Sequence, residues 1–373
     1  MAAHYEMIVI GGGIAGGSAA YHLAAAGAGR ILLLEAGSRL GAESSRAGAG
    51  ILNAHFAESP PGPFADLCFS ALDYYPEFAA SLAEETGIEV ELLDWGVLDL
   101  LRDEPDRQLS RARCEWLDAR GARYERLRAS DLRSRVPAAA GSFEEAVLYS
   151  GDKHVNNDRL IDALEAACVK RGVEIRLGAR VSGIAVEKGR AAGVVVDGVW
   201  IGAGAVVIAA GSWSGEIAKG LGRELPLQPA RGQMVSYRPK RPLLRHVLTA
   251  KLHYLVPRKR GEILAGTTFE LVGFNRETTA EGIASIKREA AAICPVLAKL
   301  EIERAWAGLR PYCEDAQPIV GPCASTPGVF FMTGHSRKGL LLGPLTGKCL
   351  AEMITTGHSS PLLQCADPRR FGL

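Results

Sequence analysis

The chain has 373 residues, and its 43 lysines and arginines against 42 aspartates and glutamates give a formal net charge of +1. This balance provides no overall field that would attract nucleic acid or an anionic membrane surface, so we expect a small-molecule partner. The length favours one large domain or two intertwined domains. The eight cysteines have no C-x-x-C pair and no zinc-ligand spacing, as is typical of buried thiols in a reducing compartment, and we expect no metal site.

The sequence also bears on targeting. The few residues before the first strand pattern leave no room for a charged region followed by a hydrophobic signal core. The longest uncharged run, "VWIGAGAVVIAAGSWSG", is short for a membrane span and rich in glycine. We therefore expect a cytoplasmic protein without membrane insertion.

The first forty residues have the layout of a nucleotide-binding βαβ unit. The apolar residues 7–10 predict a buried parallel strand, the alanine-rich residues 14–26 predict a helix, and residues 31–34 predict a second buried strand. A G-x-G-x-x-G pattern joins the first strand to the helix. This order predicts dinucleotide binding, while a glycine-rich turn in an ordinary α/β domain is the alternative.

Each glycine of this pattern has a physical role. Gly11 allows a tight turn, Gly13 lets the backbone approach a pyrophosphate, and Gly16 lets helix and strand pack closely. The helix N-terminus adds free N–H groups and a partial positive charge. Glu35, at the end of the second strand, can accept hydrogen bonds from an adenosine ribose. The unit by itself does not separate FAD from NAD.

The rest of the chain alternates between helical and strand patterns. Residues 42–52 are small and glycine-rich, which favours a loop near a ligand, with a flexible surface loop as the alternative. Alternating polar and apolar residues over 228–275 predict an antiparallel sheet. We expect helices over 66–86 and 106–121, before Gly172, before Pro295 and after the last strand "GVFFMTGHS", and strands at "GVLDLL" and between residues 174 and 211.

These patterns predict an α/β protein with two interwoven, discontinuous domains. The first is a Rossmann-like dinucleotide-binding domain formed by residues 1–85, 145–222 and 305–373. The second is a substrate domain with an antiparallel sheet and helices, formed by residues 86–144 and 223–304.

Taken in order, several motifs resemble the D-amino-acid oxidase superfamily of flavoproteins, and within it the bacterial glycine oxidases of the thiamine pathway. They are "VIGGGIAGGSAA", "SSRAGAGIL", "HVNNDRLIDAL", "VVIAAGSWS", "ARGQM", "YLVPRKRGEILAGTTFE", "AWAGLRPYCEDAQPIVG" and "TGHSRKGLLLGPLTGK". The resemblance spans nearly the whole chain. It implies the glutathione-reductase type of FAD-binding fold, FAD held non-covalently although Cys313 lies near the matching segment, and a homo-oligomer.

The resemblance also implies a reaction. A small amino acid such as glycine, sarcosine or a small D-amino acid would lose a hydride from Cα to flavin N5, giving an imine or 2-oxo acid, ammonia and H₂O₂, with O₂ or an electron carrier as acceptor. Two alternatives stay open. One is a dehydrogenase of D-amino acids or secondary amines that passes electrons to a quinone or carrier; the other is a non-catalytic flavin-binding accessory protein.

Three residues are expected at the reacting end of the site. Arg310 stands in an apolar stretch and matches the family's carboxylate-binding arginine, since a guanidinium fork can bind a carboxylate bidentately. An ion pair with Glu314 or Asp315 is its structural alternative. Tyr254 matches a substrate-site tyrosine. Arg337 matches an arginine near the flavin, with a position on the protein surface as the alternative.

The remaining expected site residues follow from the same resemblance. Ile51 and Phe269 replace methionines that often line the family's substrate cavity. Because methionine is adaptable and phenylalanine is bulky and rigid, the size and the substrate preference of the cavity stay open. The expected cofactor-binding residues are Gly11, Gly13, Ile14, Ala15, Gly16, Glu35, Ala36, Ser44, Ser45, Gly50, Val181, Ala210, Gly211, Trp213, Arg310, Arg337, Gly339 and Leu340.

Overall fold

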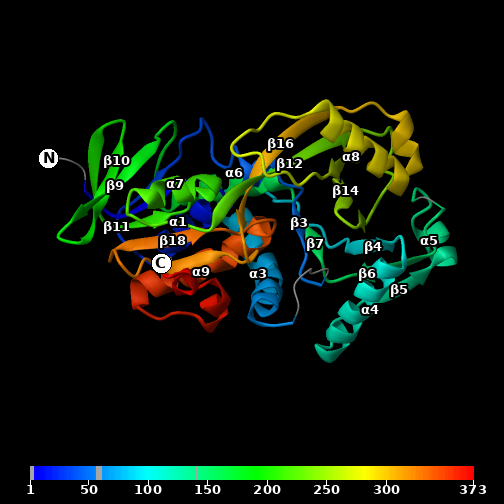
Figure 1. Cartoon of the computed structure of the whole chain (residues 1–373), viewed down its shortest axis with the longest axis horizontal. Coiled ribbons are helices and arrows are strands. Elements are labelled where there is room, and N and C mark those ends of the chain that lie inside the picture. Colours follow the sequence, from blue (N-terminus) through cyan, green and yellow to red (C-terminus); the bar gives the residue numbers. More distant parts are fainter. Residues whose placement is uncertain (1–3, 56–60, 140) are drawn as a thin grey trace.

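The computed structural model describes residues 4–55, 61–139 and 141–373. Most of its strands belong to two large sheets, each with helices packed against it, and Figure 1 shows one sheet on the left and the other on the right. The long strands β12 and β16 run between these two parts. Residues 1–3, on which the expectation about a signal segment partly rests, lie outside the described residues.

The first sheet is built around β1 (His4–Ile10), which pairs in parallel with β2 (Ile31–Leu34) and β11 (Val199–Ile208). The strand order is β17-β18-β11-β1-β2-β8, and β9 and β10 extend it as an antiparallel meander beside β11. The further members are β8 (Glu174–Arg176), β9 (Val181–Glu187), β10 (Arg190–Val196), β17 (Ile319–Pro322) and β18 (Val329–Thr333).

Both faces of this sheet are covered, which explains why its central strands are apolar throughout. Met7 and Val9 pack into one cluster with the helices, while Ile8 and Ile10 pack into a second cluster with β10 and α7. The helices of the first face are α1 (Ile14–Ala25), α3 (Pro63–Thr86), α6 (Asn157–Lys170) and α9 (Gly339–Thr356); η1 (Gly211–Trp213) and α7 (Ser214–Lys219) follow β11.

Helices α1 and α9 approach each other closely because a glycine lies between them. A Cβ at Gly347 would stand 2.9 Å from the backbone of Ser18, closer than packed atoms allow. Gly347 is buried in the body of α9, which begins at Gly339, and its lack of a side chain permits this contact. The nucleotide-binding unit is thereby fixed to the last long helix of the chain.

The second sheet has the order β16-β12-β15-β14-β13-β4-β6-β5 and is mostly antiparallel. Helix α8 packs on one face of it, and α4 packs at the end formed by β4 and β6. Its strands are β4 (Val97–Leu101), β5 (Glu125–Arg128), β6 (Glu145–Tyr149), β12 (Leu227–Tyr237), β13 (Val247–Ala250), β14 (His253–Pro257), β15 (Ile263–Gly266) and β16 (Arg304–Cys313). The remaining elements are α4 (Glu104–Ala119), α5 (Ala129–Arg135), α8 (Ala280–Ile293), η2 (Pro295–Lys299), η3 (Pro361–Ala366), η4 (Pro368–Phe371) and the small pair β3 (Ile51–Leu52) and β7 (Lys153–His154).

The predicted α/β class and the interwoven arrangement of two sheets are confirmed, but some details differ. Residues 42–52 contain the one-turn helix α2 (Ser44–Ala47) and β3, where a loop was expected. The strands β6 and β16 belong to the second sheet, although their residues were assigned to the FAD-binding segments. The reason is their pairing: β6 lies between β4 and β5, and β16 pairs along its whole length with β12. The remaining domain boundaries stay a prediction.

Two further observations concern the chain as a whole. None of the helices in the described ranges is both long enough and apolar enough to cross a membrane. All eight cysteines are free thiols, and seven of them are buried.

Candidate active site

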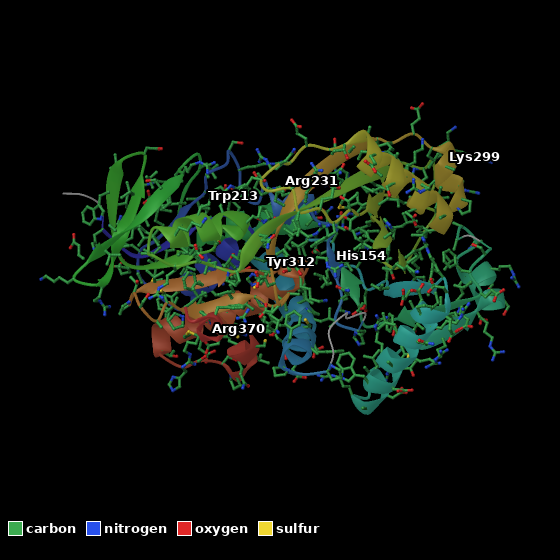
Figure 2. All side chains as sticks on the ribbon, viewed as in Figure 1. His154, Trp213, Arg231, Lys299, Tyr312 and Arg370 are labelled. Carbon is green, nitrogen blue, oxygen red and sulfur yellow. The ribbon has the colours of Figure 1, made fainter. Side chains whose placement is uncertain are left out.

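A large cavity of about 990 Å³ extends from the βαβ unit to the second sheet. Its lining comes from chain segments as far apart as Ile10 and Leu340. Known ligand cavities range up to about 1,000 Å³, so this one has room for an extended ligand. In Figure 2, the labelled Trp213, which lines the cavity, lies beside the first sheet.

The glycine turn after β1 forms one end of the cavity. Gly11 has a φ of +102°, and a Cβ there would stand 2.5 Å from the carbonyl oxygen of Ala209, so only glycine fits. A Cβ at Gly16 would stand 1.8 Å from the carbonyl oxygen of Gly11. The first helical residue, Ile14, donates its N–H to Oγ of Ser45 at 2.9 Å. Gly11, Gly13, Ile14 and Ala15 all line the cavity, so the turn and the N-terminus of α1 lie where a pyrophosphate can approach them.

Glu35 lies at the end of β2 and lines the same part of the cavity. Its two carboxylate oxygens accept hydrogen bonds from the backbone N–H groups of Gly12 at 2.8 Å and Gly37 at 2.6 Å. These bonds fix the carboxylate while leaving lone pairs for other donors. The position fits the predicted contact with an adenosine ribose.

The expected cofactor-binding residues lie together. All of them line the cavity except Gly16, which lies beneath the turn and allows the helix to pack against it. Cys313 is buried, is not among the lining residues, and has a pKa raised to about 12 by burial, so its thiol stays protonated. The cradle, the fixed acid and the size of the cavity fit FAD held without a covalent link.

Arg310 lies on β16 and points into the part of the cavity beside the second sheet. Its guanidinium donates to Oγ1 of Thr267 at 2.7 Å and to the carbonyl oxygen of Thr268 at 3.2 Å. Among the described residues, no carboxylate lies within ion-pair distance of it, and Asp315 instead pairs with Arg370 at 2.8 Å. The guanidinium is thus oriented by neutral acceptors and keeps its charge available for an anion.

Tyr254 on β14 lines the same region. Its hydroxyl lies 3.6 Å from Sδ of Met234, and burial raises its pKa while the nearby Arg310 lowers it, with a net upward shift. The phenol therefore remains an O–H donor at neutral pH. A Cβ at Gly266 would stand 2.8 Å from the tyrosine ring, so this glycine leaves room for it.

The other expected residues differ in their placement. Arg337 and Ile51 both line the cavity. Phe269 does not: its side chain is 40% exposed and packs edge-on against Tyr312, with ring centroids 5.3 Å apart. The expectation that Phe269 shapes the substrate cavity is therefore corrected. Thr267 occupies the cavity side of this segment, and residues 267–269 lie outside the regular pairing, between the end of β15 and the bridge of Glu270 to Arg231.

Several lining residues were not found from the sequence. Gly232 lies under the guanidinium of Arg310, and a Cβ there would stand 2.1 to 2.4 Å from its atoms. Thr267 orients the same group. Lys338 also lines the cavity and donates to the carbonyl oxygen of Asn53 at 3.0 Å, and burial lowers its pKa. The one signal in the sequence is that Gly232 lies within the motif "ARGQM" and Thr267 within "YLVPRKRGEILAGTTFE".

Comparison with known proteins agrees with this geometry. The family described as FAD dependent oxidoreductase matches residues 6–353. Glycine oxidases from Pseudomonas putida and Pseudomonas aeruginosa are 33% and 34% identical to the chain, each over 94% of both sequences. The crystal structure of glycine oxidase from Geobacillus kaustophilus superimposes with a TM-score of 0.93 at 28% identity, covering 98% of each chain. The resemblance seen in the sequence is confirmed, and the chain belongs to the D-amino-acid oxidase family of FAD-dependent oxidoreductases.

Proposed function

We propose that the protein is an FAD-dependent oxidase of glycine, sarcosine or a small D-amino acid. Two electrons pass from the substrate through FAD to O₂, which gives H₂O₂ and an imine, and water hydrolyses the imine to the 2-oxo acid and ammonia, or methylamine in the case of sarcosine. The family and the glycine oxidases among its relatives support the class of reaction. The observation that carries the substrate class is Arg310, a cation that faces the cavity with no carboxylate partner among the described residues.

The roles of the side chains follow from their chemistry. Arg310 has guanidinium N–H groups to spare after its two bonds to Thr267 and Thr268, so it can bind a carboxylate with two parallel hydrogen bonds. The Tyr254 hydroxyl, kept protonated by burial, can donate a further bond to the same carboxylate. Such binding fixes the direction of Cα as well as the charge of the substrate.

FAD supplies the redox chemistry when bound, by accepting the two electrons of the Cα–H bond. The protein has to admit the amino acid with a neutral amine and to hold it in one orientation. His335, which lines the cavity, has a pKa lowered to about 4 by burial and bonds Thr346 at 3.1 Å, so it adds no positive charge near neutral pH. We assign it no acid or base role.

The test is peroxide release in air from the yellow holoenzyme, offered glycine, sarcosine, D-alanine, D-proline and L-proline in parallel. We expect peroxide with glycine or sarcosine. An Arg310→Ala variant should keep FAD but lose about 100-fold or more in kcat/KM, since charged hydrogen bonds contribute about 1.5–3 kcal/mol each. The control is Arg238→Ala, because Arg238 is exposed and pairs with Glu303 at 2.7 Å.

Two results would contradict the proposal in different ways. If the amino acids reduce the flavin anaerobically but give no peroxide in air, the protein is a dehydrogenase that uses another acceptor. If Arg310→Ala retains FAD and full activity, the carboxylate site lies elsewhere.

A further inference from the structure

The two acceptors that orient Arg310 belong to a short segment, residues 267–270, that follows β15. The segment continues alongside β12: the backbone N–H of Arg231 donates to the carbonyl oxygen of Glu270 at 2.8 Å, and the N–H of Glu270 donates back at 3.0 Å. The guanidinium of Arg310 therefore crosses over β12, above Gly232, to reach the next segment of chain. Its direction depends on where that segment lies.

The two faces of β12 have different environments at this point. Gly232 and Met234 line the cavity, as do Gly308 and Arg310 on the paired strand β16. Side chains alternate along a strand, so Arg231 and Gln233 point to the opposite face. Neither of them is among the lining residues, and their exposed fractions are 5% and 0%.

On that opposite face, the buried Arg231 and the partly buried Glu270 form an ion pair. Nε of Arg231 donates to the Glu270 carboxylate at 2.7 Å, its Nη2 makes a further contact with the same oxygen, and Nη1 donates to the carbonyl oxygen of Glu277 at 2.8 Å. Burial raises the pKa of Glu270, but contacts with Thr268 and Arg231 outweigh it and lower the pKa. The carboxylate is therefore ionised at neutral pH, and the pair holds both ends of the loop that leads to α8.

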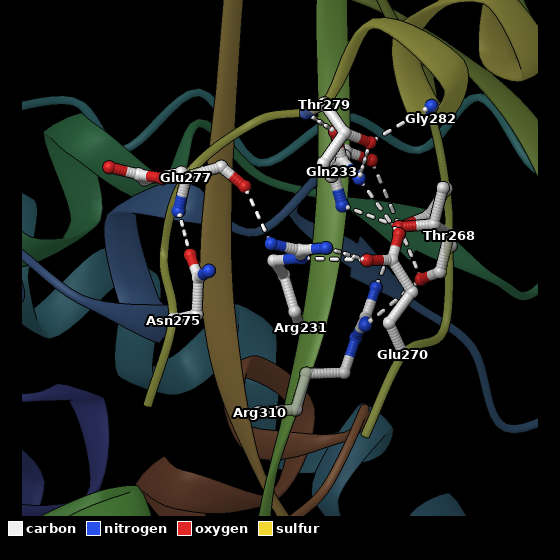
Figure 3. Close-up of polar contacts among 10 residues, drawn as sticks. Arg231, Gln233, Thr268, Glu270, Asn275, Glu277, Thr279, Gly282 and Arg310 are labelled. Carbon is white, nitrogen blue, oxygen red and sulfur yellow. Dashed lines mark hydrogen bonds and ion pairs between the residues drawn. The ribbon is translucent and has the colours of Figure 1, made fainter. Parts of the chain in front are cut away.

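Gln233 connects this pair to helix α8. Its side-chain amide donates to Glu270 at 2.8 Å and to Oγ1 of Thr279 at 3.1 Å, and its carbonyl oxygen accepts from the N–H of Thr279 at 2.8 Å. Thr279 in turn caps α8 by accepting from the N–H of Gly282 at 3.1 Å. Figure 3 shows the contacts that join Arg231, Gln233, Glu270 and Thr279, with the guanidinium of Arg310 beside Thr268. The backbone N–H of Gln233 on β12 also donates to Oγ1 of Thr268, in the 267–270 segment, at 3.0 Å.

We propose that Glu270, held by Arg231 and Gln233, is the positioning residue for the substrate-binding arginine. It touches neither the cavity nor the substrate. It fixes the segment whose Thr267 hydroxyl and Thr268 carbonyl aim Arg310, and so it sets the geometry in which the carboxylate is bound. The inference rests on the proposed function in one respect, namely that Arg310 binds the substrate carboxylate.

The test uses the holoenzyme with Glu270→Gln, which keeps the shape of the side chain and removes its charge. We expect the KM for the best amino-acid substrate and the Kd for acetate each to rise about tenfold, because the residues are in contact within one network. Acetate binding is followed by the visible spectrum of the flavin. The kcat at saturation should change far less. Arg231→Lys keeps the charge but loses the planar fork, and should give a smaller rise. It also serves as the milder variant if Glu270→Gln fails to fold.

A double-mutant cycle separates positioning from general stabilisation. In an Arg310→Ala background, Glu270→Gln should change kcat/KM by less than about twofold, because its effect passes through Arg310. Glu303→Gln, which breaks the exposed pair with Arg238, is the control and should leave KM unchanged.

The possible results have distinct meanings. An unchanged KM and acetate Kd in Glu270→Gln, or the same loss of kcat/KM in both backgrounds, would overturn the positioning role while leaving the proposed function intact. An Arg310→Ala variant with undiminished kcat/KM would instead remove the proposed carboxylate site, and the positioning role with it.

Discussion

Gly232 gives the sharpest test of how the site is built. A Cβ at this position would stand 2.1 to 2.4 Å from the guanidinium atoms of Arg310, whereas a van der Waals contact needs about 3.5 Å. In Gly232→Ala, the guanidinium must therefore move by about 1 Å, and a displacement of that size can cost about 100-fold in rate. It would also weaken one or both bonds to Thr267 and Thr268.

The stability of the fold should change little in this variant. The clashing atoms are the far end of a flexible side chain, and Gly232 lies in regular strand β12 without a positive φ. Alanine in a strand also costs less conformational entropy than glycine, by roughly 0.5–1 kcal/mol. We therefore expect a protein that holds FAD and unfolds within a few degrees of the parent, yet has a kcat/KM about 10- to 100-fold lower.

The assay is peroxide release over a range of substrate concentrations, together with thermal unfolding of the holoenzyme. Gly183→Ala is the matched control, because Gly183 is also a strand glycine and a Cβ there would meet nothing within 4 Å. A Gly232→Ala variant with unchanged kcat/KM would refute the reasoning, since Arg310 would then not need its observed position. A large loss of stability would show that the clash is not absorbed by the side chain.

Three further predictions concern the cofactor, the phenol and acid stability. Gly11→Ala should give a protein with little or no bound FAD, measured by its absorbance spectrum, because the new Cβ would clash with fixed backbone and because φ is +102°. Tyr254→Phe should raise KM by about three- to tenfold through loss of one hydrogen bond, with FAD content unchanged. Burial lowers the pKa of His22 to about 3 and the pKa values of His154 and His335 to about 4. The unfolded chain then binds more protons below its histidine pKa of about 6.5, so the free energy of unfolding should fall by roughly 2 kcal/mol from pH 7.5 to 6. A free energy of unfolding, measured in urea, that is the same at both pH values would contradict this assignment.

The features that the sequence predicted well are those set by local patterns. The βαβ unit depends on apolar runs, on the spacing of Gly11, Gly13 and Gly16, and on an acid after the second strand, all within one stretch of chain. The buried strands and most of the helices followed from the same periodicity. The family was also recognisable, because its motifs occur in a fixed order along the chain.

The features that the sequence did not predict depend on register between distant strands. Nothing in the local pattern says that Gly232 lies under Arg310, because that contact arises from the pairing of β12 with β16. Thr267 and Phe269 are two residues apart, yet one lines the cavity and the other is largely outside it. Phe269 was expected in the cavity from the family resemblance, but it lies in the irregular stretch between the end of β15 at Gly266 and the bridge of Glu270 to Arg231, and it is not among the lining residues.

The contact between α1 and α9 has a consequence for when FAD can bind during synthesis of the chain. Residues of α1 leave the ribosome early, whereas β18 and α9, which complete the first sheet and its helical layer, are synthesised late. The cavity is also closed in part by Met332, His335 and Leu340. A nascent chain that stops before these residues has the glycine turn but lacks one wall of the cavity. FAD capture should therefore follow translation of the α9 segment, so that the yellow colour of the protein reports chains that have been synthesised through α9 and folded.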